Sequence, residues 1–487
     1  MAQPYKFTSH EAFSHDSLDS LGYDWERVAN PAIAPKYPWK IYLPRSTADI
    51  VQAVCECRDL NQKLIVRSKG HSSNDLVLAE RGTILCTEKL DQIVAVDDSG
   101  LSVTVQSGVV LAELDSYLAE RGLGLPIIGD HNHITAGGFA SVGGISPASH
   151  RHGMFIDNVR SLEYVNAGGE VIRCNRDERP DEFYRVLCGC GQHGVVATLT
   201  LGLVRVDKFG HILRNERKLF KDVRRFIDES ERRIQDPGDA FMERGVWLDY
   251  LVMNRSIGAG QFSSYYETPQ SRWKSLRNRA SYRYLHGLGE MAGRLPTGLD
   301  VAVKYLGMVG VMFSPSYASI KNVEGFTDRI LDSSVGDPTR MFIVLAPVEE
   351  YAGLFSRLYE LFRAVRAESG CFTFISIYVK AIRSAYLSFR NEGRFSELMF
   401  YCGVRPEKLT GAVLEELVSK IDDACIEVGA LRYMHSKTVS DAERRRQIDP
   451  NAVRAAASRT PDVESAAKTA TGGRKRKDRS GAVPETR

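Results

Sequence analysis

The 487-residue sequence lacks an uninterrupted run of about 18 apolar residues, the length that a membrane-spanning helix requires. It also lacks, in its opening MAQPYKFTSHEAF, the basic segment and apolar run that make a secretory signal. These two absences predict a cytoplasmic protein with no membrane partner.

Cysteine pairs with the CxxC spacing of zinc sites are missing as well. The nine cysteines are an odd number, and the two close pairs, Cys55 with Cys57 and Cys188 with Cys190, have CxC spacing. Several others stand in apolar contexts, which is typical of small buried residues in a reduced, intracellular chain. We therefore predict neither disulfides nor a metal site from the cysteines.

A strong charge of one sign is absent from most of the chain. The net charge is +3, but Arg474–Arg487 alone carries six Lys or Arg against two acidic residues, a net of +4. The rest of the chain therefore carries −1. A nearly neutral body does not predict nucleic-acid or membrane binding.

The length predicts more than one hydrophobic core. In the first half, strand and helix patterns are interleaved, and several strand pairs join through short turns, which favours an α+β domain over a doubly wound parallel sheet. The second half predicts a mainly antiparallel sheet with helices on one side. The expected divisions are a lead-in (1–35), a first domain (36–206), a second domain (207–430), a segment returning to the first domain (431–451) and a disordered basic tail (452–487).

In the second domain we expect strands at 261–267, 307–313, 341–345, 371–380 and 398–404, and helices at 321–333, 347–367 and 407–428. The stretch Ser271–Gly287 is basic and aromatic. We interpret it as a solvated helix; a surface that faces a substrate or a partner is the alternative.

The segment GCGQHG, Gly189–Gly194, matches the dinucleotide pattern GxGxxG. In that motif a strand precedes the glycines and a helix follows, which places the phosphate at the helix N-terminus. Here a helical pattern precedes them and the strand pattern of 195–204 follows. The order is reversed, so the segment is not interpreted as a dinucleotide fingerprint.

Two other loops are better candidates for a phosphate-bearing ligand. The first loop, RSKGHSSND (Arg67–Asp75), follows the apolar run Leu64–Val66 and offers a glycine turn, hydroxyl groups and cationic side chains. The second loop, GDHNHITAGGFASVGGIS (Gly129–Ser146), interleaves Gly137, Gly138, Gly143 and Gly144 with small residues, so that backbone can pack closely against a ligand. Two such loops in one domain predict a large cofactor.

The four segments KGHSSND, GDHNHITAGGFASVGGIS, RHGMFIDNVRSLEYVNAGGEVIRC and FYRVLCGCGQHGVVATLTL occur in this order between residues 69 and 201. As an ordered set they resemble the vanillyl-alcohol-oxidase-type (PCMH-type) FAD-linked oxidoreductases, most of all the cytokinin dehydrogenases. The GHS element is also similar to that of sugar-lactone and alditol oxidases. The resemblance implies a two-part FAD-binding domain and a separate substrate, or cap, domain.

The resemblance also implies site residues. His71 would bond covalently to the 8α-methyl group of the flavin, and Gly70 and Ser72 would hold the pyrophosphate. Asp130 would accept a proton from the substrate. The remaining cofactor-binding residues would be Arg67, Ser68, Lys69, Asp75, Thr135, Gly137, Gly138, Ser141, Gly144, Ile145, Val196, Tyr433 and His435.

Two departures from the family pattern limit this transfer. The glutamine that follows GHS in the family is replaced by Leu76, preceded by Asn74 and Asp75, and this blurs the substrate class. The second loop has no cysteine, so we expect one covalent link and not two. His131 and His133, with His150 and His152 further along, are expected to line the site or bond to loop backbone; a metal site is the alternative.

The chemistry that follows is oxidation of a CH–OH or CH–NH group of a small molecule, with oxygen or another electron acceptor. A redox-neutral epimerisation or cyclisation on the flavin is a second hypothesis. A degenerate flavin-binding module is a third. The sequence does not indicate the substrate or the oligomeric state.

Overall fold

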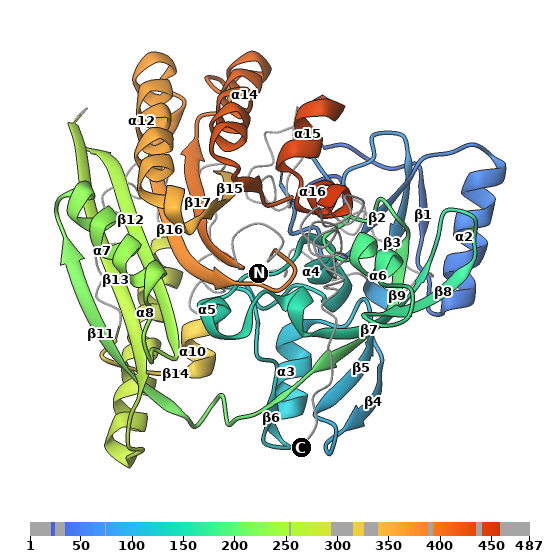
Figure 1. Cartoon of the computed structure of the whole chain (residues 1–487), viewed down its shortest axis with the longest axis horizontal. Coiled ribbons are helices and arrows are strands. Elements are labelled where there is room, and N and C mark those ends of the chain that lie inside the picture. The colour runs from blue at the N-terminus through green and yellow to red at the C-terminus, as the bar shows by residue number, and fades with distance from the viewer. Residues whose placement is uncertain are drawn as a thin grey trace, which may run out of the picture.

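The computed structural model of the chain describes residues 21–24, 35–73, 75–252, 255–293, 315–325, 339–387, 393–434 and 441–457. Several predictions therefore lie wholly or largely outside the described residues: most of the lead-in, the strand at 307–313, most of the helix at 321–333, the placement of His435 and the tail beyond residue 457. Within these ranges the fold is α+β, with three main sheets, as predicted (Figure 1).

The first sheet is three-stranded and parallel, in the order β1-β3-β2, and it carries the first loop. β1 (Lys40–Tyr42) leads into α2 (Thr47–Asp59), and β2 (Leu64–Arg67) and β3 (Thr83–Cys86) follow. A capping box formed by Ser46 and Asp49 starts α2. The first loop begins at the last residue of β2.

The second sheet is five-stranded and antiparallel, in the order β4-β5-β9-β7-β8. Its helices α3 (Leu111–Ala119), α4 (Ala136–Val142) and α6 (Pro180–Val186) contribute to one large apolar core with it. The strands are β4 (Ile93–Asp97), β5 (Ser102–Gln106), β7 (Val159–Val165), β8 (Val171–Asn175) and β9 (Val195–Gly202). Because α6 precedes the GCGQHG segment and β9 follows it, the reversed order predicted for that segment is confirmed.

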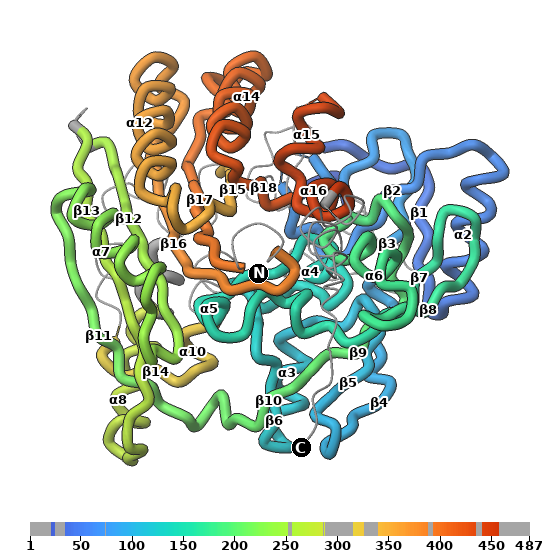
Figure 2. The backbone as a smooth tube through the Cα atoms, viewed as in Figure 1, coloured from blue at the N-terminus to red at the C-terminus, as the bar shows by residue number. Residues whose placement is uncertain are grey.

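The third sheet, which we call the cap sheet, has eight strands in the order β14-β11-β13-β12-β16-β17-β15-β18. Every pairing in it is antiparallel. Its strands are β11 (Ile212–Phe220), β12 (Met242–Val252), β13 (Arg255–Glu267), β14 (Tyr317–Ser319), β15 (Thr339–Pro347), β16 (Phe372–Arg383), β17 (Arg394–Val404) and β18 (Leu431–Arg432). Figure 2 shows the cap strands β11, β12 and β13 on the left of the molecule and the first and second sheets on the right.

One face of the cap sheet is covered by α7 (Val223–Gln235), α12 (Tyr351–Ser369) and α14 (Gly411–Val428), as Figure 1 shows. An aromatic core joins these helices to the sheet; the rings of Phe362 and Phe400, for example, stack with centroids 4.4 Å apart. Because side chains alternate along a strand, the polar side chains of Ser376, Tyr378 and Lys380 fall on the opposite face. That face is the one that turns toward the two loops.

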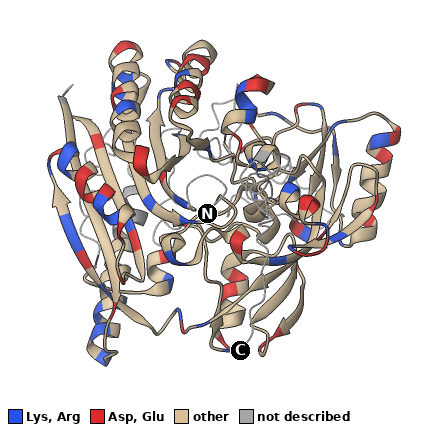
Figure 3. Ribbon diagram, viewed as in Figure 1, with Lys and Arg blue, Asp and Glu red and all other residues tan. Residues whose placement is uncertain are grey.

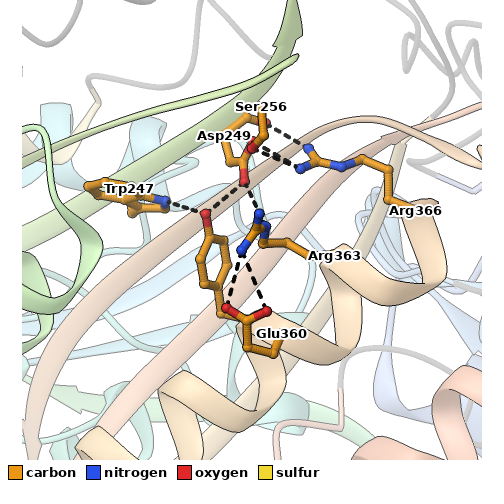
Figure 4. Close-up of polar contacts among 7 residues, drawn as sticks. Trp247, Asp249, Ser256, Glu360, Arg363 and Arg366 are labelled. Carbon is orange, nitrogen blue, oxygen red and sulfur yellow. Dashed lines mark hydrogen bonds and ion pairs between the residues drawn. The ribbon is translucent and has the colours of Figure 1, made fainter. Parts of the chain in front are cut away.

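A buried polar network ties α12 to the cap sheet (Figure 4). The Asp249 carboxylate accepts hydrogen bonds from the Tyr359 hydroxyl at 2.7 Å, from Arg366 at 3.0 Å and from Ser256 at 2.5 Å. Trp247 donates its indole N–H to the Tyr359 oxygen at 3.3 Å. Asp249 is fully buried, so these partners compensate the removal of its charge from water.

Parts of the fold differ from the sequence prediction, which did not include β11, α7 or β12. The second loop contains a helix, α4, which the sequence did not predict because glycines are poor helix formers. The first residues of the segment predicted as a disordered tail are helical, in α16 (Pro450–Ala457). The side-chain amide of Asn451 donates to the carbonyls of Tyr184, Arg185 and Leu187 at 2.9–3.0 Å, and this anchors α16 beside α6.

All nine cysteines are free thiols. Among the described residues, no helix is both long and apolar enough to cross a membrane.

Candidate functional site

A cavity of about 850 Å³ lies between the two loops and the cap sheet. This volume is near the upper end of the roughly 300–1,000 Å³ typical of ligand sites. Both loops contribute to its wall, as does the strand β9. The predicted site residues that line it are Ser68, Lys69, Gly70, His71, Ser72, Asp75, Asp130, Thr135, Gly137, Gly138, Ser141, Ile145, Val196 and Tyr433.

Arg67 and Gly144 are not among the cavity-lining residues, and both support the loops instead. Arg67 is buried and donates to the Tyr23 carbonyl at 2.9 Å. Its guanidinium lies against the turn at Gly70, where φ is +72° and an added Cβ would stand 2.3 Å from it. Only glycine fits there, so Arg67 fixes the shape of the first loop from behind.

The return segment touches the second loop at Gly144. The Gly144 N–H donates to the Tyr433 hydroxyl at 2.9 Å, and burial raises the pKa of that hydroxyl well above its ordinary range. A Cβ at Gly144 would lie 2.4 Å from that of Phe155. Tyr433 thus connects the end of the cap sheet with the cavity.

The first loop is held on both sides. Ser68 shares a hydrogen bond with Thr87, and Lys69 lies 3.5 Å from Glu88. Burial raises the pKa of Glu88 to about 7, although Lys69 and Arg67 oppose the shift. Near the end of the loop, Asp75 pairs with Lys36 at 2.5 Å. These contacts fix the first loop so that Lys69 lies at the wall of the cavity.

His71 projects from this loop toward the histidines of the second loop. Its ring centroid lies 4.2 Å from that of His131, which in turn lies 5.7 Å from that of His133. Burial, followed by the neighbouring His131, lowers the pKa of His71 well below its ordinary value. The neutral imidazole is the form with a nucleophilic nitrogen.

The second loop forms the opposite wall through α4. The Thr135 hydroxyl caps this helix by accepting from the Gly138 N–H at 3.3 Å. A Cβ at Gly137 would stand 2.5 Å from that of Ser107, so the helix can pack this closely only with glycine. A Cβ at Gly138 would enter the space between Thr135 and Ser68, 3.0 Å from the Thr135 hydroxyl. The glycine thus keeps a cradle open between the two loops.

The third wall is the polar face of the cap sheet, which the sequence analysis did not identify. Lys380 on β16 and Glu397 on β17 are directly paired across the strands, and their side chains are 2.6 Å apart. Lys380 also lies 2.5 Å from Asp130 Oδ2. Further residues from the same face are Met341, Ile343, Tyr378, Met399 and Tyr401.

Lys380 is buried between two carboxylates. Burial alone would lower its pKa, but the charges of Asp130 and Glu397 outweigh burial and raise it, so the ammonium stays protonated. Burial raises the pKa of Glu397, although Lys380 opposes the shift. The buried Arg244 on β12 adds a second cation near Asp130, and the charges of these four residues balance.

Metal binding has no support in the described residues, which contain no group of three or more potential ligands. His150 instead makes a 2.9 Å hydrogen bond to the Ala240 carbonyl, the backbone contact predicted as the alternative to a metal site.

Comparison with known proteins shows a similarity that includes both loops of the site. Residues 38–175 match the family described as an FAD binding domain. Both loops lie within or at the edge of the matched range. This match agrees with the resemblance predicted from the ordered motifs, of which the first three lie within residues 38–175: this part of the chain is similar to FAD-binding domains of FAD-linked oxidoreductases.

The similar proteins fall into two groups. Cytokinin dehydrogenase 3 of Arabidopsis thaliana is 28% identical over 260 residues, which cover 51% of this chain and 48% of that protein. L-gulonolactone oxidase of Mus musculus is 29% identical over 167 residues, covering 34% of this chain and 38% of that protein. A putative D-arabinono-1,4-lactone oxidase of Neurospora crassa is 27% identical over 260 residues, which cover 53% of this chain and 46% of that protein. The alignments thus span about half, or less, of these relatives.

The residues present fit FAD. The cavity is large, nearly half of its lining residues from the two loops are glycine, serine or threonine, and Lys69 provides a cation suited to phosphate. The cradle at Gly138 would be filled by any side chain. Ser68, Gly70, Ser72 and Gly138 are the residues that would hold the phosphates, and His71 lies within the same cavity.

Proposed function

We propose that this protein is an FAD-dependent oxidoreductase that oxidises a CH–OH or CH–NH group of a small molecule. The observation that carries the proposal is that one cavity is lined by His71 from the first loop, Asp130 from the second loop and Lys380 from the cap sheet. The FAD, when bound, supplies the hydride acceptor. The protein supplies binding, orientation and proton transfer.

His71 is proposed as the covalent anchor of the flavin. Three features support this role: its place in the GHS element, its position on the cavity wall, and the low pKa that keeps the imidazole neutral. The adjacent His131 ring restricts the orientation of the His71 ring. One covalent link is expected.

Asp130 is proposed as the group that takes the substrate proton as the hydride leaves. Its side chain is 16% exposed, so it reaches the cavity while remaining shielded from bulk water. Lys380 fixes the position of the carboxylate. When Asp130 accepts a proton and becomes neutral, Glu397 remains as the counter-charge of Lys380, so no unpaired cation is left buried.

The substrate remains to be found by experiment. The purified protein is mixed, without oxygen, with L-gulonolactone, D-arabinono-1,4-lactone or a cytokinin, which are the compounds named by its relatives. Loss of the oxidised flavin absorbance identifies a substrate. Asp130→Asn should slow that reduction by roughly 10²- to 10⁴-fold with unchanged flavin content. An unchanged rate would remove Asp130 from the reaction.

The same experiment in air separates oxidation from redox-neutral chemistry. Stoichiometric consumption of oxygen or of an added dye per product supports an oxidoreductase. Product formed without consumption of either would support epimerisation or cyclisation instead.

A further inference from the structure

The helix α8 (Arg272–Gly293) lies on the cap, outside the candidate active site. It projects at the lower left of the molecule in Figures 1 and 3. It corresponds to the basic and aromatic stretch that the sequence predicts as a solvated helix, and the proposed function does not require its outer surface.

The inner face of α8 is fixed to the cap. The side-chain oxygen of Asn278 accepts from the Ser319 N–H at 3.1 Å and from the Asn322 amide at 2.9 Å. Tyr282, one turn further, is also buried. These residues define which side of the helix faces the protein, and therefore which side faces outward.

The centre of the outer face is apolar. Trp273, Leu276 and Tyr284 are 60%, 58% and 68% exposed, which is high for large apolar side chains. With Ala280 they follow the spacing i, i+3, i+7, i+11, so they form one stripe opposite Asn278 and Tyr282. The Trp273 ring meets Tyr317 of the cap strand β14 edge-on, with centroids 6.3 Å apart, yet most of its surface stays exposed.

The charged residues that flank the stripe along α8 are cationic, and the acidic residue of this helix, Glu290, comes only in its last turn. Five Lys or Arg residues and no acidic residue occur between Ser271 and Gly289. Arg277 lies on one side of the stripe, with its guanidinium 5.1 Å from the Trp273 ring, and Arg272, Arg279 and Arg283 lie exposed on the other side. Figure 3 shows this cluster in blue on the projecting helix.

We propose that the outer face of α8 binds the surface of an anionic lipid bilayer. A helix with Trp and Leu at the centre of its outer face and arginines on both flanks lies in the membrane interface. The apolar side chains enter the boundary of the acyl chains, and the arginines reach the headgroups. This surface does not depend on the proposed oxidoreductase function.

An anionic membrane fits this face better than the other partners of a basic helix. Nucleic acid would pair with the arginines but would leave Leu276 exposed. The whole-chain charge of +3 predicts no membrane binding because the acidic residues elsewhere hide the local cluster. Contact with the bilayer depends on the exposed tryptophan and on the positive charge of α8, and not on the net charge of the whole chain.

The test is co-sedimentation of the full-length, flavin-loaded protein with lipid vesicles. Vesicles of phosphatidylcholine with phosphatidylglycerol should bind the protein, and vesicles of phosphatidylcholine alone should bind it far more weakly. Arg277→Gln with Arg283→Gln should weaken binding roughly 25-fold, about fivefold for each charge. Trp273→Ser with Leu276→Ser should weaken it by roughly tenfold or more.

The matched control is Trp39→Ser, since Trp39 is 72% exposed but lies beside β1 in the first domain. It should bind as the unchanged protein does. Circular dichroism and flavin absorbance verify that each variant is folded, and the arginine variants test the surface even if the apolar variant fails to fold. The proposal is overturned if the protein does not sediment with anionic vesicles, if it binds both vesicle types equally, or if the α8 variants bind normally. Retention of DNA or of an acidic protein without vesicle binding would also contradict it.

Discussion

Lys380 Nζ lies 2.5 Å from Asp130 Oδ2, and this ion pair joins the cap sheet to the second loop at the wall of the cavity. Lys380 lies on a strand of the cap sheet and Asp130 on the second loop, and the two residues are far apart in the sequence. The candidate base is thus held in place by a residue of the other domain. Binding of the cofactor and positioning of the base are therefore assigned to different halves of the chain.

Replacing Lys380 tests this division. Lys380→Met should slow flavin reduction by the substrate roughly 10- to 100-fold, because the Asp130 carboxylate loses the group that positions it. Flavin content should change little. Stopped-flow reduction measured over a range of pH distinguishes positioning from general damage, since loss of the ammonium should move the pH profile and a structural effect should not.

The matched control is Lys218→Met, because Lys218 is also on a cap strand but its side chain is 55% exposed. Its flavin should be reduced by the substrate at the same rate as in the unchanged protein. If Lys380→Met leaves both rate and pH profile unaltered, Lys380 has no part in positioning Asp130.

The sequence predicts the loop walls of the site but not its cap wall, and the reason is physical. Gly70 lies within the first loop, and Gly137 and Gly138 lie within the second, so close backbone approach leaves a local signature in each loop. Lys380 and Glu397 meet only because β16 and β17 pair in a particular register. The alternation of Ser376, Tyr378 and Lys380 with apolar residues was a usable signal that one face of β16 is not core.

The internal helix of the second loop was missed for a related reason. Gly137 and Gly138 lower helix propensity, so AGGFASV does not suggest a helix. The Thr135 cap and the packing of Gly137 on Ser107 stabilise the helix in the folded protein. Tertiary contacts override the local preference here. The strands β11 and β12 were not predicted at all, since charged residues interrupt their apolar patterns, at exposed positions in β11 and at buried positions such as Glu243 and Asp249 in β12.

The Asp249 network should be essential for stability and dispensable for flavin binding. Asp249→Ala leaves Arg366 buried without its carboxylate, which should cost about 3–5 kcal/mol of unfolding free energy. Urea unfolding measures this. Asp59→Ala, at a site 66% exposed, should change stability by no more than about 0.5 kcal/mol. Equal stabilities of the two variants would show that the network contributes little.

Glu243 should make stability depend on pH. Burial raises its pKa to about 7 from an ordinary value of 4.5, although Ser264 and Arg233 oppose the shift. The folded state therefore binds this proton more tightly than the unfolded state. The contribution to stability is fully present at low pH, falls as pH rises between about 4.5 and 7, and is constant above that.

Glu243→Gln removes the titration and keeps an oxygen that can accept from Ser264. Relative to the unchanged protein, its unfolding free energy should rise by about 2–3 kcal/mol between pH 4.5 and 7. Urea unfolding at a series of pH values measures the difference. Parallel curves for the two proteins would show that Glu243 does not titrate in this window.

The central claim is that the cavity holds FAD and that His71 tethers it. The visible spectrum of the pure protein, recorded before and after acid precipitation, tests this most directly. The account predicts a flavin spectrum that stays with the precipitated protein, and loss of the flavin to the supernatant in His71→Ala. Flavin released completely from the unchanged protein would contradict the covalent link, and a protein that contains and binds no flavin would contradict the account as a whole.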